Sequence, residues 1–83
     1  MAYLYILKTI KDTYYIGSTA NIEERLKYHR AGRVKSTQDR LPVTLVFKEF
    51  HKNKAEAQKK EYKFKRWKNK KMIEKVIQLG PIA

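Results

Sequence analysis

The apolar residues of three short stretches have the composition of β-strands. Residues 3–7 are aromatic and β-branched, and residues 14–17 repeat this pattern after residues 11–13, whose polar side chains are typical of a turn. These two stretches predict a β-hairpin. Pro42 opens the third and clearest strand, residues 43–50, at a position where strands tolerate proline.

Three further stretches have apolar residues at helical spacing. Asn21 and Asn53 each stand three residues before a Glu, and this capping-box pattern predicts the start of a helix. Gly32 ends the first of these helices, and Asn69 is predicted to cap a third, short one. The predicted helices are residues 22–31, a second from Asn53 to about Trp67, and a third that stops at Gly80 before Pro81.

The predicted order of elements is therefore ββαβαα. A three-stranded antiparallel sheet flanked by helices is the smallest α+β arrangement that buries the ten aromatic residues of this chain. A length of 83 residues fits one small domain, and the sequence contains no linker, internal repeat or low-complexity tract. Residues 1–83 are predicted to form a single α+β domain.

The composition excludes several classes of site and protein. The absence of cysteine excludes disulfide scaffolds, cysteine-bound zinc, iron–sulfur clusters and thiol catalysis. The chain also has no Ser/His/Asp set, no His pair at metal spacing and no Gly-rich phosphate loop. No apolar run is long enough to cross a membrane, and the first seven residues lack the features of a signal peptide. We expect a soluble cytoplasmic protein without a membrane partner.

The charge of the chain is strongly positive and uneven. The chain has 20 Lys and Arg against 8 Asp and Glu, a net charge of +12, and +8 of this lies between residues 51 and 75. Basic side chains that neutralise phosphates release counterions, so this favours a nucleic-acid partner. The alternatives are a charge that serves solubility alone and an anionic membrane surface, which requires a basic amphipathic helix. The predicted nucleic-acid-binding residues are Lys59, Lys60, Lys63, Arg66 and Lys70.

The chemically suggestive residues lie in the hairpin and the first two helices. Tyr5 and Tyr15 occupy neighbouring predicted strands, where a shared face is compatible with the pattern. Arg25 and His29 are four residues apart on the first helix and therefore share a face. Glu61 is a lone carboxylate amid four lysines of the most basic helix, Lys59, Lys60, Lys63 and Lys65.

Together these residues make the chain resemble the GIY-YIG nuclease family. Leu4-Tyr5-Ile6, then Tyr15-Ile16-Gly17, then Arg25, His29 and Glu61 follow the order of that family's motifs, and the match covers nearly the whole chain, including Thr37. The chain is most similar to the small single-domain bacterial members. The resemblance implies hydrolysis of a DNA phosphodiester with one divalent metal, Mg²⁺ or Mn²⁺.

The resemblance also implies catalytic roles for Tyr5, Tyr15, Arg25, His29 and Glu61. Glu61 matches the metal-binding glutamate, and a hard cation accepts one carboxylate plus water and phosphate oxygens. Arg25 matches an arginine whose guanidinium suits two phosphate oxygens. The two tyrosines match the residues that orient or deprotonate the attacking water, and His29 matches a supporting position that contacts a tyrosine or the phosphate.

Each of these residues also has an ordinary structural interpretation. Glu61 can pair with Lys65 one turn later, and Arg25 can pair with Glu24 or stay solvated. Both tyrosines can be core residues with bonded hydroxyls, and His29 can face the dipole at the end of its helix. Phe64 and Trp67 can stack on a base, although core packing is the preferred interpretation for both.

The sequence departs from the family pattern at two points. The first motif reads Leu4-Tyr5-Ile6 instead of Gly-Ile-Tyr, although its tyrosine is retained. Asn69 follows Glu61 at a shorter spacing than the family's late active-site asparagine, and a helix cap is its preferred interpretation. Weak activity, or a need for a protein partner, is the expected consequence if that asparagine is missing.

The predicted function is therefore a metal-dependent DNA endonuclease in DNA repair or recombination. The alternative is a non-catalytic binding module of the same fold, acting on DNA or structured RNA. A third interpretation is a small basic protein bound to a ribosome or another large complex. In the nuclease interpretation, a protein partner or a second copy is expected to supply selectivity.

Overall fold

The computed structural model describes residues 1–67 and 69–80, and its elements follow the predicted order ββαβαα. The elements are β1 Ala2–Thr9, β2 Tyr14–Thr19, α1 Ile22–Arg30, the 3₁₀ helix η1 Gln38–Arg40, β3 Val43–His51, α2 Lys54–Trp67 and α3 Lys70–Leu79. The α+β class and the three-stranded antiparallel sheet are thus confirmed.

The three strands form one antiparallel sheet in the order β2-β1-β3. Tyr5 lies opposite Gly17 of β2 on one side and Lys48 of β3 on the other. The strands are longer than predicted, because the ladder includes polar and terminal pairs such as Tyr3 with Thr19. The free edge of β2 remains available to the elements that follow it.

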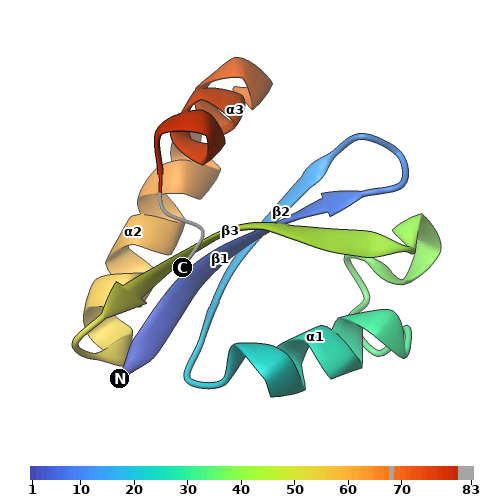
Figure 1. The fold of residues 1–83 in the computed structure, drawn as a ribbon, viewed down its shortest axis with the longest axis horizontal. Helices are drawn as coiled ribbons and strands as arrows, with labels where there is room; N and C mark the ends of the chain where they lie inside the picture. Colours follow the sequence, from blue (N-terminus) through green and yellow to red (C-terminus); the bar gives the residue numbers. More distant parts are fainter. Residues whose placement is uncertain (68, 81–83) are drawn as a thin grey trace.

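The helices cover both faces of the sheet (Figure 1), with α1 on one face and α2 and α3 on the other. The period of β1 explains this arrangement, because alternate side chains of a strand point to opposite faces. Leu4 and Ile6 pack with Phe64 of α2, whereas Tyr5 packs with Leu26 of α1. Each face of the sheet therefore has its own hydrophobic core.

The helix caps agree with the predictions. The side-chain oxygen of Asn21 accepts the N–H of Glu24, and that of Asn53 accepts the N–H of Glu56. Asn69 caps α3 by accepting the N–H of Lys71. α3 ends before Gly80, as predicted, while Pro81 lies outside the described residues.

The predicted irregular segment between α1 and β3 contains one short element, η1. The Arg40 N–H donates to the Thr37 carbonyl at 2.9 Å, and the Ile10 N–H donates to the Arg40 carbonyl at 3.1 Å. The segment is thereby joined to the β1–β2 hairpin. Its polar sequence has no apolar period, so local turns and contacts with other segments, and not a repeating pattern, define its conformation.

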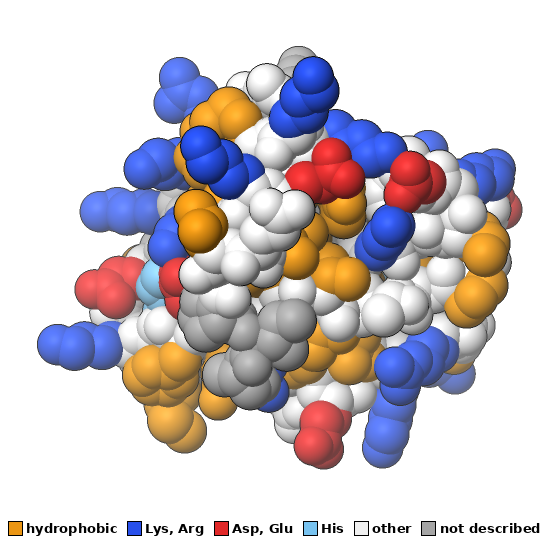
Figure 2. All heavy atoms as spheres, turned by 45° about the horizontal axis from the view of Figure 1, so that its top comes forward, with side chains coloured by type: hydrophobic (Ala, Val, Ile, Leu, Met, Phe, Trp, Pro, Cys, Tyr) orange, Lys and Arg blue, Asp and Glu red, His pale blue; other side chains and the backbone are white. Residues whose placement is uncertain are grey.

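The surface reflects the basic composition. Lys and Arg side chains project around the rim of the molecule in Figure 2, with hydrophobic side chains exposed nearer its centre. Phe64 is buried and stacks on Trp67 with ring centroids 4.6 Å apart, in agreement with the core role preferred for both. None of the helices in the described ranges is long and apolar enough to cross a membrane.

Candidate active site

The structure brings Tyr5, Tyr15 and His29 together on the α1 side of the sheet. The Tyr5 hydroxyl lies 3.2 Å from Nε2 of His29. The Tyr15 ring centroid lies 4.9 Å from that of His29 and 6.2 Å from that of Tyr5. The shared face that the pattern allowed for the two tyrosines is therefore present, with His29 of α1 beside both.

Gly17 provides the space that Tyr5 occupies. A Cβ atom added at Gly17 would stand 2.6 Å from the Tyr5 hydroxyl oxygen and 2.7 Å from its Cζ. Real Cβ contacts are essentially never so short, because atoms in a packed interior already touch. The glycine of the second motif is thus a packing requirement of the tyrosine in the first, a relation that the motif residues alone do not reveal.

His29 is fully buried, and both of its ring nitrogens are hydrogen-bonded. The Thr37 hydroxyl donates its single proton to the Val34 carbonyl at 3.5 Å. The Thr37 hydroxyl oxygen and Nδ1 of His29 lie 2.8 Å apart, and we assign the proton of this bond to Nδ1, so that the hydroxyl oxygen accepts it. Nε2 of His29 is left as the acceptor for the Tyr5 hydroxyl proton.

Burial and charge shift the pKa values of this cluster. Burial lowers the pKa of His29 below its ordinary value of 6.5, and the Arg25 guanidinium lowers it further. Burial also raises the pKa of Tyr5 well above its ordinary value of 10, with Tyr15 adding to the rise through charge and hydrogen bonding and Arg25 opposing it. Near pH 7, His29 is therefore neutral and Tyr5 keeps its proton.

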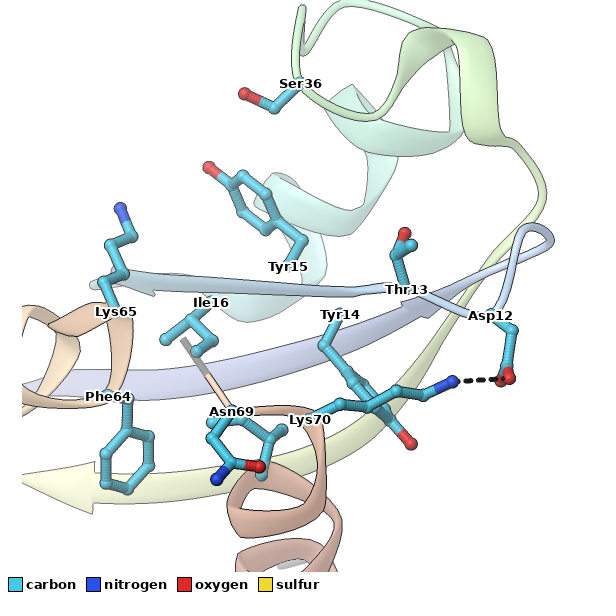
Figure 3. Close-up of a pocket in the computed structure, with 11 residues that line it drawn as sticks. Asp12, Thr13, Tyr14, Tyr15, Ile16, Ser36, Phe64, Lys65, Asn69 and Lys70 are labelled. Carbon is cyan, nitrogen blue, oxygen red and sulfur yellow. Dashed lines mark hydrogen bonds and ion pairs between the residues drawn. The ribbon is translucent and has the colours of Figure 1, made fainter. Parts of the chain in front are cut away.

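Tyr15 is the more accessible of the two tyrosines. Tyr5 is 1% exposed, whereas Tyr15 is half-buried and lines a cavity of about 460 Å³ at the free edge of β2. Figure 3 shows the Tyr15 hydroxyl pointing into the space between Ser36 and the ammonium group of Lys65. Asn69 lines the same cavity from the far side of β2. A substrate atom can therefore reach Tyr15 directly.

Arg25 lies on the exposed side of α1, one turn before His29. It lines a hollow of about 330 Å³ together with Ser18 and Lys54. The alternative pairing with Glu24 is not formed within the described part of the chain, where Glu24 instead accepts the Tyr28 hydroxyl at 3.3 Å. The guanidinium of Arg25 remains available for an anion.

Glu61 projects from α2 toward the free edge of β2. Its Oε1 accepts the Ser18 hydroxyl at 2.6 Å, and its Oε2 pairs with the Lys65 ammonium at 2.7 Å. The ion pair predicted from the i,i+4 spacing is thus present, but Ser18 adds a second, tertiary contact. Ser18 was missed by the sequence analysis, because a lone serine in a strand has no pattern that links it to a residue 43 positions later.

Glu61 and the tyrosines approach the edge of β2 from opposite faces of the sheet. Gly17 lies under Tyr5 on the α1 face, and its neighbour Ser18 faces α2 and binds Glu61. The charge of Glu61 contributes to the raised pKa of Tyr5, although it is the smallest of the causes. Four of the five predicted residues therefore lie on the α1 side of the sheet, with Tyr5 and His29 buried there, and Glu61 reaches strand β2 from the α2 side.

The site offers a metal few protein ligands. Within residues 1–67 and 69–80, no three His, Asp or Glu side chains are grouped so that they could hold an ion. Glu61 nevertheless fits a cation that keeps most of its water, since a carboxylate can accept more than the two bonds made by Ser18 and Lys65. Such an ion would need phosphate oxygens of a substrate to complete its coordination.

The predicted nucleic-acid-binding residues do not form one surface around Glu61. Lys60 donates to Glu49 at 2.6 Å, and Lys70 pairs with Asp12 at 2.7 Å. Lys59, Lys63 and Arg66 line a separate hollow with Tyr62 and Trp67. The basic helix therefore presents cations on more than one side.

Comparison with curated proteins finds relatives of similar size. A UPF0213 protein of Clostridium perfringens is 48% identical over 67 residues, which cover 80% of this chain and 72% of that protein. A UPF0213 protein of Staphylococcus haemolyticus is 42% identical over 76 residues, which cover 87% of this chain and 93% of that protein.

A solved structure and a family model agree with these relatives. The solution NMR structure of a UPF0213 protein from Bacillus halodurans is 32% identical, with a TM-score of 0.61 over 99% of this chain and 89% of that one. The model of the GIY-YIG catalytic domain matches residues 1–75. That match covers the sheet, α1, α2 and all five residues of the candidate site, so the chain belongs to the GIY-YIG family.

Proposed function

We propose that residues 1–83 act as one nuclease domain that hydrolyses DNA phosphodiesters with the help of Mg²⁺ or Mn²⁺. The observation that carries the proposal is the position of Tyr15, Arg25 and Glu61 around one edge of β2, each adjoining solvent. A phosphodiester at this edge could meet a hydroxyl, a guanidinium and a carboxylate together. We further propose a cytoplasmic role in DNA repair or recombination, in keeping with family membership.

Glu61 would hold the cation, and Arg25 would bind the phosphate. When bound, a divalent cation supplies positive charge at the phosphate oxygens. Arg25 can donate two parallel hydrogen bonds to the same group and offset the charge that develops during attack. Ser18 would keep the Glu61 carboxylate oriented, because its hydroxyl donates at 2.6 Å from the strand edge itself.

The cluster of Tyr15, Tyr5 and His29 would receive the proton of the attacking water, with Tyr15 packed against both partners and the Tyr5–His29 hydrogen bond as the inner link. The water oxygen bonds to phosphorus, and the bond from phosphorus to the leaving oxygen breaks. The water proton passes to the Tyr15 hydroxyl, the Tyr15 proton to Tyr5, and the Tyr5 proton to Nε2 of His29. The leaving oxygen takes a proton from a solvent water. The relay then runs in reverse, so that the proton held at the buried His29 leaves through Tyr15, which lines the open cavity. Neutral His29, with Nδ1–H held by Thr37, is in the protonation state that this relay requires.

The proposal is tested by cleavage of labelled plasmid, branched and single-stranded DNA with Mg²⁺, Mn²⁺ or EDTA. We expect cleavage that EDTA abolishes and that Glu61→Gln and Tyr15→Phe each lower by about 10²-fold or more, the usual effect of removing one electrostatic or proton-transfer group. Glu56→Gln and Tyr14→Phe are matched controls. Glu56 is an exposed glutamate of α2, and Tyr14 bonds Glu74 on the opposite face of β2.

Two results would overturn the nuclease proposal: no DNA is cut under any condition, or the Glu61 and Tyr15 variants cut as fast as their controls. The second candidate function is non-catalytic binding of DNA or structured RNA. It is favoured by the scarcity of metal ligands in the described ranges and by the occupation of both Glu61 oxygens. In that case binding survives Glu61→Gln and weakens steeply with salt, while no cleavage is seen.

A further inference from the structure

The outward side of α2 carries a basic and aromatic surface that the proposed active site does not use. We call it the outer α2 surface and define it as Lys59, Tyr62, Lys63, Arg66 and Trp67, which line a hollow of about 430 Å³. In Figure 2, Lys and Arg side chains project from the left side of the molecule, where α2 lies in Figure 1.

Helix geometry separates this surface from Glu61. Lys59, Lys63 and Arg66 recur at intervals of four and three residues, so they form one stripe along α2. At about 100° per residue, this stripe lies about 140–200° around the helix from Glu61. Ala57 and Phe64 on the inner side are buried against the sheet, which fixes the stripe as the outward side.

The cations of the stripe differ from their neighbours on the same helix in having no anionic partner. Lys60 pairs with Glu49, and Lys65 pairs with Glu61. In the portion of the chain that the structure describes, Lys59, Lys63 and Arg66 form no ion pair. Their charges are therefore available to an external anion with charges spaced along the helix.

The aromatic residues identify the class of anion. Tyr62 is 62% exposed in the middle of the stripe and is the aromatic residue that carries this argument, since Trp67 at the end of the stripe is half-buried and stacks on Phe64 in the core. Exposed aromatic rings among cations are the arrangement that binds nucleic acids, in which phosphates meet the cations and bases or sugars meet the rings. A simple inorganic anion would make no use of the rings.

We propose that the outer α2 surface binds a second segment of nucleic acid while a first segment occupies the candidate active site. The surface binds phosphates without regard to sequence, because Lys and Arg contacts to the backbone carry no base information. Binding of the first segment rests on the proposed nuclease function, whereas binding of the second segment does not depend on catalysis. A helix is about 10–12 Å thick and a duplex is stiff, so one straight duplex does not contact both sides of α2.

The test counts the short duplexes bound by one protein molecule. The probe is a DNA duplex of about one helical turn, some ten base pairs, prepared with two different fluorophores. The Glu61→Gln protein is used so that the probe stays intact. We expect two duplexes per protein at saturation in low salt, and complexes that contain both colours.

The test variant is Lys59→Ala/Lys63→Ala/Arg66→Ala, made in the same background. We expect it to bind one duplex and to form no two-colour complex. The second binding step should disappear, because the phosphate contacts that make it salt-dependent are those of the three removed cations. The control Lys11→Ala/Lys52→Ala/Lys75→Ala removes the same charge from three exposed positions on other elements and should retain two-duplex binding.

The outcomes separate this proposal from the nuclease proposal. One duplex per protein before mutation, or two after it, overturns the second binding surface. The triple substitution in the otherwise unchanged protein should leave cleavage of a short duplex within about twofold of normal, in keeping with a surface remote from the site. A larger loss would place the three cations in the active site and overturn the inference. Two-duplex binding without any cleavage would refute the nuclease and leave the outer surface standing.

Discussion

The two polar regions of this molecule are built in opposite ways. Around His29, the polar groups are buried and each has a partner within the chain, from the Val34 carbonyl to the Tyr5 hydroxyl. On the outer α2 surface, Lys59 and its neighbours are exposed and lack ion-pair partners among the described residues. The His29 cluster fixes the geometry that the proposed proton transfer needs, whereas the outer α2 surface is available to bind an anionic ligand.

This difference has an energetic consequence. A buried polar group that loses its hydrogen-bond partner still carries the full free-energy cost of its desolvation. Removal of an exposed charge, in contrast, changes the free energy of unfolding little. Substitutions in the His29 cluster should therefore change the stability of the fold. Substitutions on the outer surface should change binding and leave stability nearly constant.

The strongest expected effect on stability comes from Gly17→Ala. The added Cβ would stand 2.6 Å from the Tyr5 hydroxyl oxygen, and the buried Tyr5 ring cannot move away without displacing its neighbours. Overpacking of this kind costs about 3 kcal/mol at the upper end of its usual range. Urea unfolding measures it as a lowered midpoint with an unchanged m-value.

A double-mutant cycle shows whether Tyr5 is the cause. Tyr5→Leu removes the hydroxyl and Cζ, so Gly17→Ala should cost at least 1 kcal/mol less in that background, as expected for residues in contact. Equal costs in both backgrounds would mean that strand propensity, not the ring of Tyr5, governs position 17. The motif glycine would then have no connection with the site.

The next largest loss of stability is expected from Thr37→Val, which keeps the shape of the side chain and removes its hydroxyl. The His29 Nδ1–H then loses the acceptor that lies 2.8 Å away in a fully buried position. An unpartnered buried donor costs about 1–2 kcal/mol, which equilibrium unfolding can measure. Thr37→Ser should restore most of the loss. If the valine variant is as stable as the parent, the hydrogen bond between His29 and Thr37 does not stabilise the fold.

The same substitution separates positioning from simple stability. Thr37 touches no exposed surface, so in the proposed mechanism it acts only by holding Nδ1 of His29. Thr37→Val should lower the rate of cleavage while leaving the affinity of the Glu61→Gln background for DNA unchanged. A loss of affinity without a loss of rate would contradict the positioning role.

These predictions also show which parts of the structure the sequence can reveal. The aromatic and β-branched composition of β1 and the capping boxes at Asn21 and Asn53 predict the elements, because both are local features. Thr37 and Ser18 carry the bonds that orient His29 and Glu61, and each is a single hydroxyl outside any repeating pattern. Their importance follows from contacts between distant segments, which spacing along the chain does not encode.

The basic helix illustrates the same limit. Counting charges between residues 51 and 75 predicts a nucleic-acid surface but treats all the lysines alike. The structure divides them, because Lys60 and Lys70 are neutralised by Glu49 and Asp12 from other elements. Only the positions that face outward without a partner keep their charge for a ligand.

A smaller effect concerns the pH dependence of stability. The native pKa of His29 is held below 6.5 by burial and then by Arg25, whereas in the unfolded chain it returns to about 6.5. Below that pH the unfolded state binds the extra proton first, so the free energy of unfolding falls as the pH decreases from 6.5 toward the native pKa. His29→Gln should reduce the dependence of the free energy of unfolding on pH, measured by urea titrations between pH 7 and 5.

The control is His51→Gln, at the end of the edge strand β3, which should retain this pH dependence. Identical slopes in the parent and His29→Gln would refute a neutral buried imidazole.

The smallest effect on stability, and the sharpest contrast with Gly17, is expected from the triple alanine variant of the outer α2 surface. Lys59, Lys63 and Arg66 are exposed and have no ion pair to lose among the described residues, and alanine has the highest helix propensity. The free energy of unfolding should change by less than about 0.5 kcal/mol without DNA. With saturating DNA the parent should gain stability and the variant less, because only the native state binds the ligand. A large loss of stability without DNA would show that these side chains stabilise the fold. The distinction between the hydrogen-bonded cluster around His29 and an outer surface that is free to bind a ligand would then not hold.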